Sequence, residues 1–349
     1  MPSVVTMAAL ARQLGVSKNT ISLALRGDNR VSAATCARVR TAAARADYAL
    51  NPVVSHLMTE LRRSGTPLGR RRTLALINGY RTADAFRRHP TIPAYVAGCR
   101  RRAAALGYGI DTFWLHSASL DGRKLERILT ARGIRGVILI GMMDNHRLPD
   151  RFSDTWSQFA CAVTGVRTEQ PELSFCCVDH HMLVVKAVEH AVSLGYRRPA
   201  LVLDQRIDDL VDGRFGGAML TAQQTLAAAN RVAPFRDLPA ARSDPALFHR
   251  WLKREKPDVL LTLYTVVRRW VESAGLSVPG DIGLIQMEKR PDSAEWAGMD
   301  QHNDLVGEAA VDMVVSQIHR NERGPDNPPR ATLIEPSWVF GNTVRAAAL

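Results

Sequence analysis

Most of the chain, from Thr73 onward, alternates short apolar runs with amphipathic stretches, and this alternation limits the fold more than any other feature. The apolar runs have the length and composition of buried parallel strands: TLALI, IDTFWL, GVILIG, FACAVTG, PALVLD, DVLLTL and GLIQM. Stretches with helical spacing lie between them, including residues 94–106, 183–194 and 245–256. This alternation predicts a doubly wound α/β sheet whose length suits two lobes, with a ligand cleft at the carboxyl ends of the strands.

The net charge of +12 is concentrated at one end of the 349-residue chain. Residues 1–72 hold twelve arginines and lysines against three acidic residues, so this segment carries +9 and the remainder is close to neutral. A compact basic segment joined to a neutral body favours a module that binds a polyanion such as nucleic acid. A solvated basic face is the plain alternative.

Several classes of protein are disfavoured by what the sequence lacks. No apolar run approaches the roughly 18 residues of a membrane span, and residues 1–15 do not have the pattern of a signal peptide. The five cysteines are scattered without zinc-type spacing, so we expect reduced thiols in the cytoplasm. His180 and His181 are adjacent at a strand end and would point apart, which disfavours a metal site. Without a nucleophile, metalloprotease or phosphate-loop motif, we expect no enzyme and no cofactor.

The first fifty residues show three short helical segments, each preceded by a residue that favours a helix N-cap. Thr6 precedes the first segment, Ser17 the second and Ser32 the third, and Gly15 allows a tight bend between the first two. Such an arrangement predicts a helix-turn-helix unit, whose second helix would enter the major groove of DNA. On that helix Ile21, Ala24 and Leu25 would pack inward. The residues expected on its outward face are Lys18, Asn19, Ser22 and Leu23.

Residues 5–52 resemble the head of the lactose/galactose repressor (LacI-type) family of bacterial transcription regulators. The shared elements are Val5-Thr6, the Ala-x-x-x-Gly-Val-Ser turn from Ala11 to Ser17, Thr20-Ile21-Ser22, Val31-Ser32, Thr35, Tyr48 and Asn51. The resemblance implies a helix-turn-helix head (1–50), a hinge helix and basic linker (51–72), and a two-lobed periplasmic-binding-protein-like domain (73–349). It also implies a homodimeric, operator-specific repressor, located at the nucleoid in the cytoplasm and controlled by a sugar or sugar derivative.

In that family the residues after the turn serine contact base edges, which implies this role for Lys18, Asn19 and Leu23. Lysine suits guanine O6 and N7, and asparagine suits adenine N6 and N7. Leu23 would meet a thymine methyl group or pack on the head instead. The residues that would contact the DNA backbone and fix the register are Thr6, Ser17, Ser22, Asn29 and Arg30.

Asn51 and Pro52 introduce a segment that resembles the family's hinge helix, which folds on operator DNA and pairs with its twin. Proline suits the first position of a helix. Counting from Tyr48 and Asn51, two positions the family shares, places the leucine that wedges into the minor groove at Leu57. An ordinary linker helix is the alternative. Asn51 and Leu57 complete the set of expected DNA contacts.

The resemblance continues through the large domain. Its strongest elements there are Val178-Asp179-His180, Arg214-Phe215-Gly216-Gly217 and the run from Gly275 to Ile282. Arg214 is the effector residue it implies most directly, because an arginine at that place binds sugar hydroxyls or a carboxylate. Glu288 stands in place of the family's aspartate. Tyr80 and Trp114 would supply stacking walls for the effector or pack in the core.

Two other functions stay open at this point. The run LTLYT (residues 261–265) replaces the family's Asn-Asp, which favours a nonspecific or constitutive DNA-binding protein whose sensing domain is inert. The second is a DNA-acting enzyme such as a recombinase, for which we find no constellation of nucleophile and carboxylates.

Overall fold

A computed structural model of the chain describes residues 7–25, 31–46, 72–290, 293–325 and 328–346. The chain divides into two compact units, residues 1–70 and 71–349, which are described separately below. Among the described residues, no helix has both the length and the apolar character needed to cross a membrane. Thr6, Asn29, Arg30, Asn51 and Leu57 lie outside the described residues, so their proposed DNA contacts stay predictions.

The N-terminal unit contains three short helices, as the capping residues predict: α1 (Met7–Leu14), α2 (Lys18–Leu25) and α3 (Ala33–Arg45). Ser17 Oγ accepts a hydrogen bond from the Thr20 amide at 3.0 Å, and Ser32 Oγ accepts one from the Thr35 amide at 3.3 Å. Both caps satisfy an amide that has no partner within its own helix. Gly15 makes the bend with a φ of +67°, which glycine adopts without strain. The buried core of this unit consists of Leu10, Ala11, Ile21, Ala24, Val39 and Ala43.

The first lobe of the large unit is built on a parallel sheet with the strand order β10-β5-β4-β3-β1-β2. These strands are β1 (Thr73–Asn78), β2 (Gly109–Trp114), β3 (Gly136–Ile140), β4 (Ala160–Thr164), β5 (Ser174–Val178) and β10 (Ala331–Ile334). Helices α6 (Ile92–Ala105) and α14 (Asn303–Arg320) cover one face of the sheet. The other face is covered by α7 (Gly122–Ala131) and the 3-10 turns η1 (Asp150–Phe152) and η2 (Thr155–Gln158).

Helices α6 and α14 cross at two glycines, which allows their backbones to approach closely. A Cβ on Gly98 would lie 1.8 Å from the carbonyl oxygen of Asp304, and one on Gly307 would lie 2.2 Å from that of Tyr95. No other residue fits at either place without moving a helix, since both obstacles are backbone atoms. The crossing fixes α6, and the segment that leads into α6 reaches the cavity described below.

The second lobe is built on a sheet with the order β11-β9-β8-β7-β6. Its strands are β6 (Pro199–Val202), β7 (Val259–Thr262), β8 (Gly283–Gln286), β9 (Ala297–Asp300) and β11 (Ser337–Val339). One face carries α8 (His180–Ser193) and α10 (Arg214–Gln224), and the other carries α11 (Leu238–Ser243), α12 (Ala246–Glu255) and α13 (Val266–Ser273). The short helix α9 (Gln205–Leu210) follows β6, and the 3-10 turn η3 (Ala228–Asn230) follows α10.

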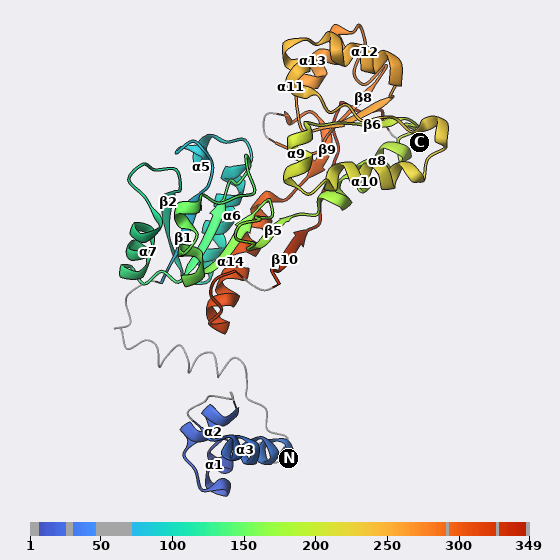
Figure 1. The fold of residues 1–349 in the computed structure, drawn as a ribbon. Helices are drawn as coiled ribbons and strands as arrows, with labels where there is room; N and C mark the ends of the chain where they lie inside the picture. The colour runs from blue at the N-terminus through green and yellow to red at the C-terminus, as the bar shows by residue number, and fades with distance from the viewer. Residues whose placement is uncertain (1–6, 26–30, 47–71, 291–292, 326–327, 347–349) are drawn as a thin grey trace. The chain divides into compact units, whose positions relative to one another are not determined.

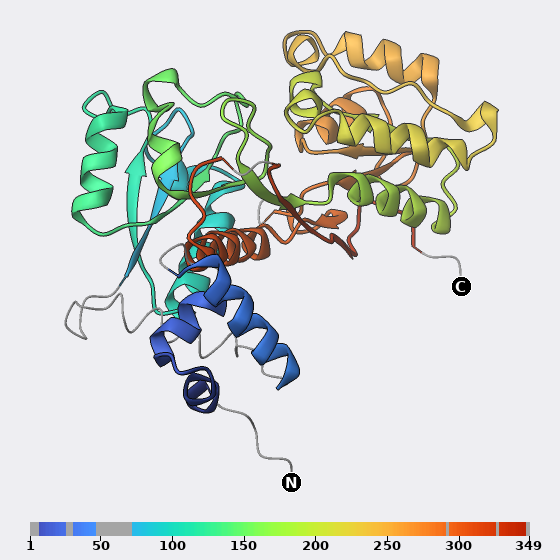
Figure 2. The same ribbon diagram turned by 60° about the horizontal axis from the view of Figure 1, so that its bottom comes forward.

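The chain passes between the lobes after β5, after β9 and after β10, so each lobe is assembled from distant parts of the sequence (Figures 1 and 2). The doubly wound α/β prediction is confirmed, and the seven apolar runs form β1, β2, β3, β4, β6, β7 and β8. The prediction missed β5, β9, β10 and β11. Strand β11 also pairs antiparallel with β9, so the second sheet is not wholly parallel. Strands β10 and β11 are edge strands with partly exposed residues, which explains why they lack a continuous apolar run.

Candidate functional site

Helix α2 presents a polar surface at its N-terminal end. Ser17, Lys18 and Asn19 are exposed, and Leu23 is half-buried. Ser22 differs from the prediction, because its side chain is buried and only 8% exposed. Helix α2 contacts both α1 and α3, so its buried arc is wider than the stripe of Ile21, Ala24 and Leu25 suggested. The exposed set therefore comes from the start of the helix.

A cavity of about 520 Å³ lies in the large unit, between the carboxyl ends of the strands of both sheets. The loops after β1, β3 and β4 contribute lining residues from the first lobe, and those after β6, β7, β8 and β9 contribute from the second. A cavity of this size, at this edge of parallel sheets, suits a small molecule. The lining residues used below are Tyr80, Arg81, His89, Tyr95, Asp144, His180, Arg206, Tyr264, Glu288, Arg290 and Gln301.

Aromatic rings and imidazoles form much of the wall. The Tyr80 ring packs edge-to-face on the His89 imidazole, with centroids 4.9 Å apart, and His180 packs in the same manner on Phe215 at 4.9 Å. Burial and the nearby Arg214 guanidinium lower the pKa of His180 to about 3. Burial raises the pKa of Tyr264 to about 12. His180 and Tyr264 are therefore neutral at pH 7 and offer uncharged hydrogen-bonding atoms to a ligand.

The charged groups that line the cavity already have partners. Arg81 makes a two-pronged contact with the Asp144 carboxylate, from Nε at 2.9 Å and from an Nη atom at 2.6 Å. Glu288 is only 7% exposed, and Asn303 Nδ2 donates a hydrogen bond to it at 3.0 Å. Arg290 donates to the Leu263 carbonyl at 2.8 Å and lies 4.0 Å from Glu288. Because these charges are balanced within the protein, the cavity does not require a charged ligand.

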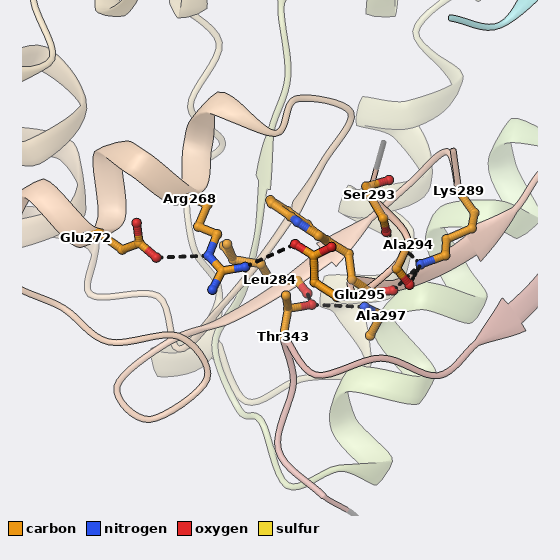
Figure 3. A network of polar contacts seen from close by, with 10 residues as sticks. Arg268, Glu272, Leu284, Lys289, Ser293, Ala294, Glu295, Ala297 and Thr343 are labelled. Atoms are coloured by element: carbon orange, nitrogen blue, oxygen red, sulfur yellow. Dashed lines mark hydrogen bonds and ion pairs between the residues drawn. The ribbon is translucent and has the colours of Figure 1, made fainter. Parts of the chain in front are cut away.

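The loop after β8 carries Glu288 and Arg290 at the cavity. The residue between them, Lys289, anchors this loop. Lys289 points back into the loop, where its Nζ donates to the carbonyls of Ser293 and Ala294 at 2.8 Å each (Figure 3). Burial lowers the pKa of Lys289. Beside this loop, Thr343 Oγ1 donates to the Leu284 carbonyl at 2.7 Å and accepts from the Ala297 amide at 3.0 Å, which ties the C-terminal segment to β8 and β9.

Both units match models of known families. Residues 6–51 match the model of the bacterial regulatory proteins of the lacI family, and residues 188–344 match that of the periplasmic binding protein-like domain. The chain thus joins a DNA-binding head of the lacI type to a periplasmic-binding-protein-like domain. With this combination the protein is a DNA-binding transcriptional regulator, and α2 lies within the residues that the lacI model matches.

Solved structures share the fold of this chain. The lac repressor dimer bound to operator and the anti-inducer ONPF is 19% identical, with a TM-score of 0.58 over 98% of this chain and 99% of that one. A complex of the transcriptional regulator CelR with cellobiose is 18% identical, with a TM-score of 0.56 over 97% and 99%. A LacI transcriptional regulator from a Rhodococcus species is 16% identical, with a TM-score of 0.58 over 80% and 100%. No protein of curated function matches the sequence.

The four effector residues implied by the LacI resemblance fall into two groups. Tyr80 and Glu288 line the cavity, as expected of effector contacts. Trp114 does not line it. Strand β2 lies beside β1, and Trp114 Nε1 donates a hydrogen bond to the Tyr80 carbonyl at 3.0 Å. Trp114 thus holds the backbone of a lining residue.

Arg214 also lies outside the cavity lining, near the lining residue His180, and its guanidinium lies over the Phe175 ring at 5.9 Å. Its Nε donates to the Val211 carbonyl at 2.8 Å, and one Nη atom lies 3.3 Å from Cys177 Sγ. The other Nη atom is buried and has no hydrogen-bond partner in the described part of the chain. Arg214 is therefore a structural residue in this arrangement that keeps one donor unused.

Several cavity residues were not predicted. His89 follows the four-residue helix α5 (Ala85–Arg88), and Tyr95 comes from the first turns of α6. Asp144 and Arg290 are charged residues among many in the sequence, without a distinguishing pattern. Asp144 and Arg290 each follow the end of a strand that lies toward the other lobe. Only the topology of the sheets reveals this shared position. His180 was noted as part of the family-like run Val178-Asp179-His180 and as a disfavoured metal ligand, but not as a cavity residue. Among the described residues no cluster suited to a metal occurs.

Proposed function

We propose that this protein is an operator-specific transcriptional repressor whose DNA affinity changes when a small, carbohydrate-like effector binds in the cavity between the lobes. The observation that supports this proposal is the cavity itself, about 520 Å³ in volume and lined by residues of both lobes. A ligand there contacts loops from both sheets and so stabilises one lobe arrangement over another. Such differential affinity is what couples effector binding to a distant activity.

The chemistry of the lining favours a hydroxylated ligand. Aromatic faces such as Tyr80 and Tyr264 cover apolar sugar surfaces, whereas the Glu288 carboxylate accepts hydrogen bonds from hydroxyl groups. The buried, unused donor of Arg214 lies one residue from Phe215, which lines the cavity. We retain Arg214 as an effector contact, made through that unused donor.

The proposal includes a homodimer that binds a near-palindromic operator at the nucleoid, in the cytoplasm, and it includes no catalytic activity. Two identical heads with the exposed surface of Lys18 and Asn19 suit an operator with twofold symmetry. The lac repressor that shares this fold is a dimer on its operator, and CelR binds cellobiose. Both precedents fit the function proposed here.

The experiment has two stages. Selection from random duplexes with the purified full chain identifies the operator, and the operator complex is then titrated with neutral mono- and disaccharides while DNA binding is followed by fluorescence anisotropy. A sugar that shifts operator affinity supports the proposal. Arg214→Ala should abolish that shift and leave operator affinity without sugar within about a few-fold.

The rival function gives a different pattern in the same experiment. A constitutive or nonspecific DNA-binding protein would bind random duplexes with similar affinity, and its binding would depend on salt but not on sugar. Enrichment of no sequence would refute operator specificity. Operator binding that no sugar changes would refute the carbohydrate response alone.

A further inference from the structure

The imidazole of His89 has two roles: it caps the start of a helix, and it lines the cavity. His89 lies between α5 and α6, and its Nδ1 accepts hydrogen bonds from the Thr91 amide at 3.1 Å and the Ile92 amide at 3.4 Å. These are amides at the start of α6 that have no carbonyl partner within the helix. Since Nδ1 accepts from backbone N–H groups, it carries no proton.

The tautomer of His89 follows from this geometry. A neutral imidazole with an unprotonated Nδ1 carries its hydrogen on Nε2. Burial and the nearby Arg290 lower the pKa of His89, so the neutral ring persists at pH 7. No hydrogen-bond acceptor for Nε2 occurs in the described part of the chain. The Tyr80 ring packs against the imidazole edge-to-face and fixes its orientation in the cavity wall.

The surroundings of His89 indicate the class of ligand that its Nε2–H meets. The three cavity arginines have partners: Arg81 binds Asp144, Arg206 binds Asp204 at 3.0 Å, and Arg290 binds the Leu263 carbonyl. A phosphate or carboxylate would compete with these partners for the guanidinium groups, and each partner that it displaced would cost a charge-assisted hydrogen bond. A neutral oxygen that accepts a hydrogen bond meets no such cost.

We propose that His89 is a specificity-determining residue of the effector site, whose Nε2–H donates a hydrogen bond to a hydroxyl or ring oxygen of a neutral, hydroxylated ligand. This inference rests on the carbohydrate response proposed above and deepens it. It assigns the ligand as an uncharged sugar rather than a sugar phosphate or a sugar acid. The hydrogen bonds that His89 Nδ1 accepts at the start of α6 then fix the orientation of the Nε2–H donor.

Two substitutions separate the cap from the ligand contact. In His89→Asn, Oδ1 takes the place of Nδ1 and can keep the cap, but nothing reaches the position of Nε2–H. In His89→Gln, the amide nitrogen reaches that position, whereas the acceptor for the amides of α6 is lost. We expect His89→Asn to melt like the wild type and to bind sugar at least about tenfold more weakly. His89→Gln should melt at a lower temperature and keep its sugar affinity within about threefold.

The binding measurement is calorimetry on the full chain with named probes. The neutral probes are D-glucose, D-galactose, D-xylose and cellobiose, and the charged probes are D-glucose 6-phosphate and D-glucuronate. A neutral probe that binds the wild type and His89→Gln, but not His89→Asn, supports the inference. Two-bond ¹⁵N–¹H spectra of histidine-labelled protein should show His89 with its proton on Nε2.

The opposing outcomes are distinct from one another. Equal sugar affinity of the wild type and His89→Asn would overturn the role of His89 while leaving the carbohydrate response intact. Tighter binding of the phosphate or the glucuronate than of every neutral probe would overturn the assigned ligand class. Failure of all six probes to bind the wild type would overturn the carbohydrate response and this inference together.

Discussion

The head and the sensing domain of this protein build their sites in opposite ways. In the head, the exposed residues Ser17, Lys18 and Asn19 are consecutive in the sequence and belong to the start of one helix. In the sensing domain, the cavity gathers residues as distant as Tyr80 and Gln301, each from a different loop. A local site can be identified from a short pattern, whereas a site assembled by topology requires the fold.

The two regions also differ in how much core supports the site. The head has one small core, in which Leu10 and Ile21 are large and fully buried. The sensing domain has a core on each face of both sheets. A domain of about fifty residues has only a few kcal/mol of stability, and one of nearly three hundred residues has more to lose. Replacement of a buried leucine by alanine should therefore have different consequences in the two regions.

The largest expected effect comes from that comparison. Leu10→Ala and Leu76→Ala each remove a fully buried leucine side chain, and each should cost about 2–5 kcal/mol. That loss is comparable to the whole stability of the head, so Leu10→Ala should abolish operator binding. Leu76→Ala should lower the melting temperature of a sensing domain that stays folded. Calorimetry and operator titration measure both effects. Operator affinity within threefold of the wild type for Leu10→Ala would contradict this account.

The next effect tests whether the local site reads sequence. Lys18→Ala and Asn19→Ala should each lose about 1–3 kcal/mol of binding at particular base pairs of the operator, because each removes a hydrogen bond to a base edge. Arg30→Ala serves as the control and should weaken binding to all sequences about equally. Titration of operators with single base-pair replacements makes the comparison. Losses that are uniform over all these operators for Lys18→Ala and Asn19→Ala would show that they contact only the backbone.

How far the sequence alone leads depends on the range of the interactions. Ser17, Ser32 and Gly15 were correct because capping and bending act over three or four residues. Ser22 was misplaced because its burial depends on two other helices. Trp114 was expected either at the effector or in the core. It hydrogen-bonds to the backbone of Tyr80, a neighbour that only the pairing of β1 and β2 brings close.

The cavity residues show the same limit. Tyr80 and Glu288, which the resemblance to the family implied as effector contacts, line the cavity, and their contact with an effector stays a prediction. His89 was missed because its role arises from α5 and the cap on α6, and the sequence Arg-Arg-His-Pro gives no sign of either. Strand β5 was missed because SFCCV has a serine and two cysteines, although every one of its residues is buried.

The pH dependence of stability tests whether the imidazole of His180 is buried in the sensing domain. Its pKa of about 3 in the folded protein lies below the value near 6.5 of an unfolded chain. Between these two values the unfolded state binds more protons, so stability falls as the pH is lowered, by about 1.4 kcal/mol per pH unit at most. Urea unfolding of the sensing domain at pH 7, 6 and 5 should show this slope.

The matched variant is His180→Asn, which removes the titrating group and keeps a polar side chain. Its stability should fall less steeply between pH 7 and pH 5, whatever its stability at pH 7. Other groups that titrate, such as His89, contribute equally to both proteins and cancel in the comparison. Identical slopes would mean that His180 is protonated as readily in the folded protein as in the unfolded chain.

The smallest expected effect separates a structural role from DNA contact within the head. Ser17 and Ser32 are both exposed, and each caps a helix within a Ser-x-x-Thr pattern, with hydroxyl oxygens 2.8 Å and 2.9 Å apart. Replacing either serine by alanine should therefore cost the head a similar free energy of unfolding, about 1 kcal/mol. Only Ser17 begins the helix expected in the major groove, so only Ser17→Ala should weaken operator binding further, and equally for all sequences. Thermal unfolding of the head and operator titration of both variants give the two quantities. Equal losses of operator affinity in the two variants would show that Ser17 acts through the cap alone.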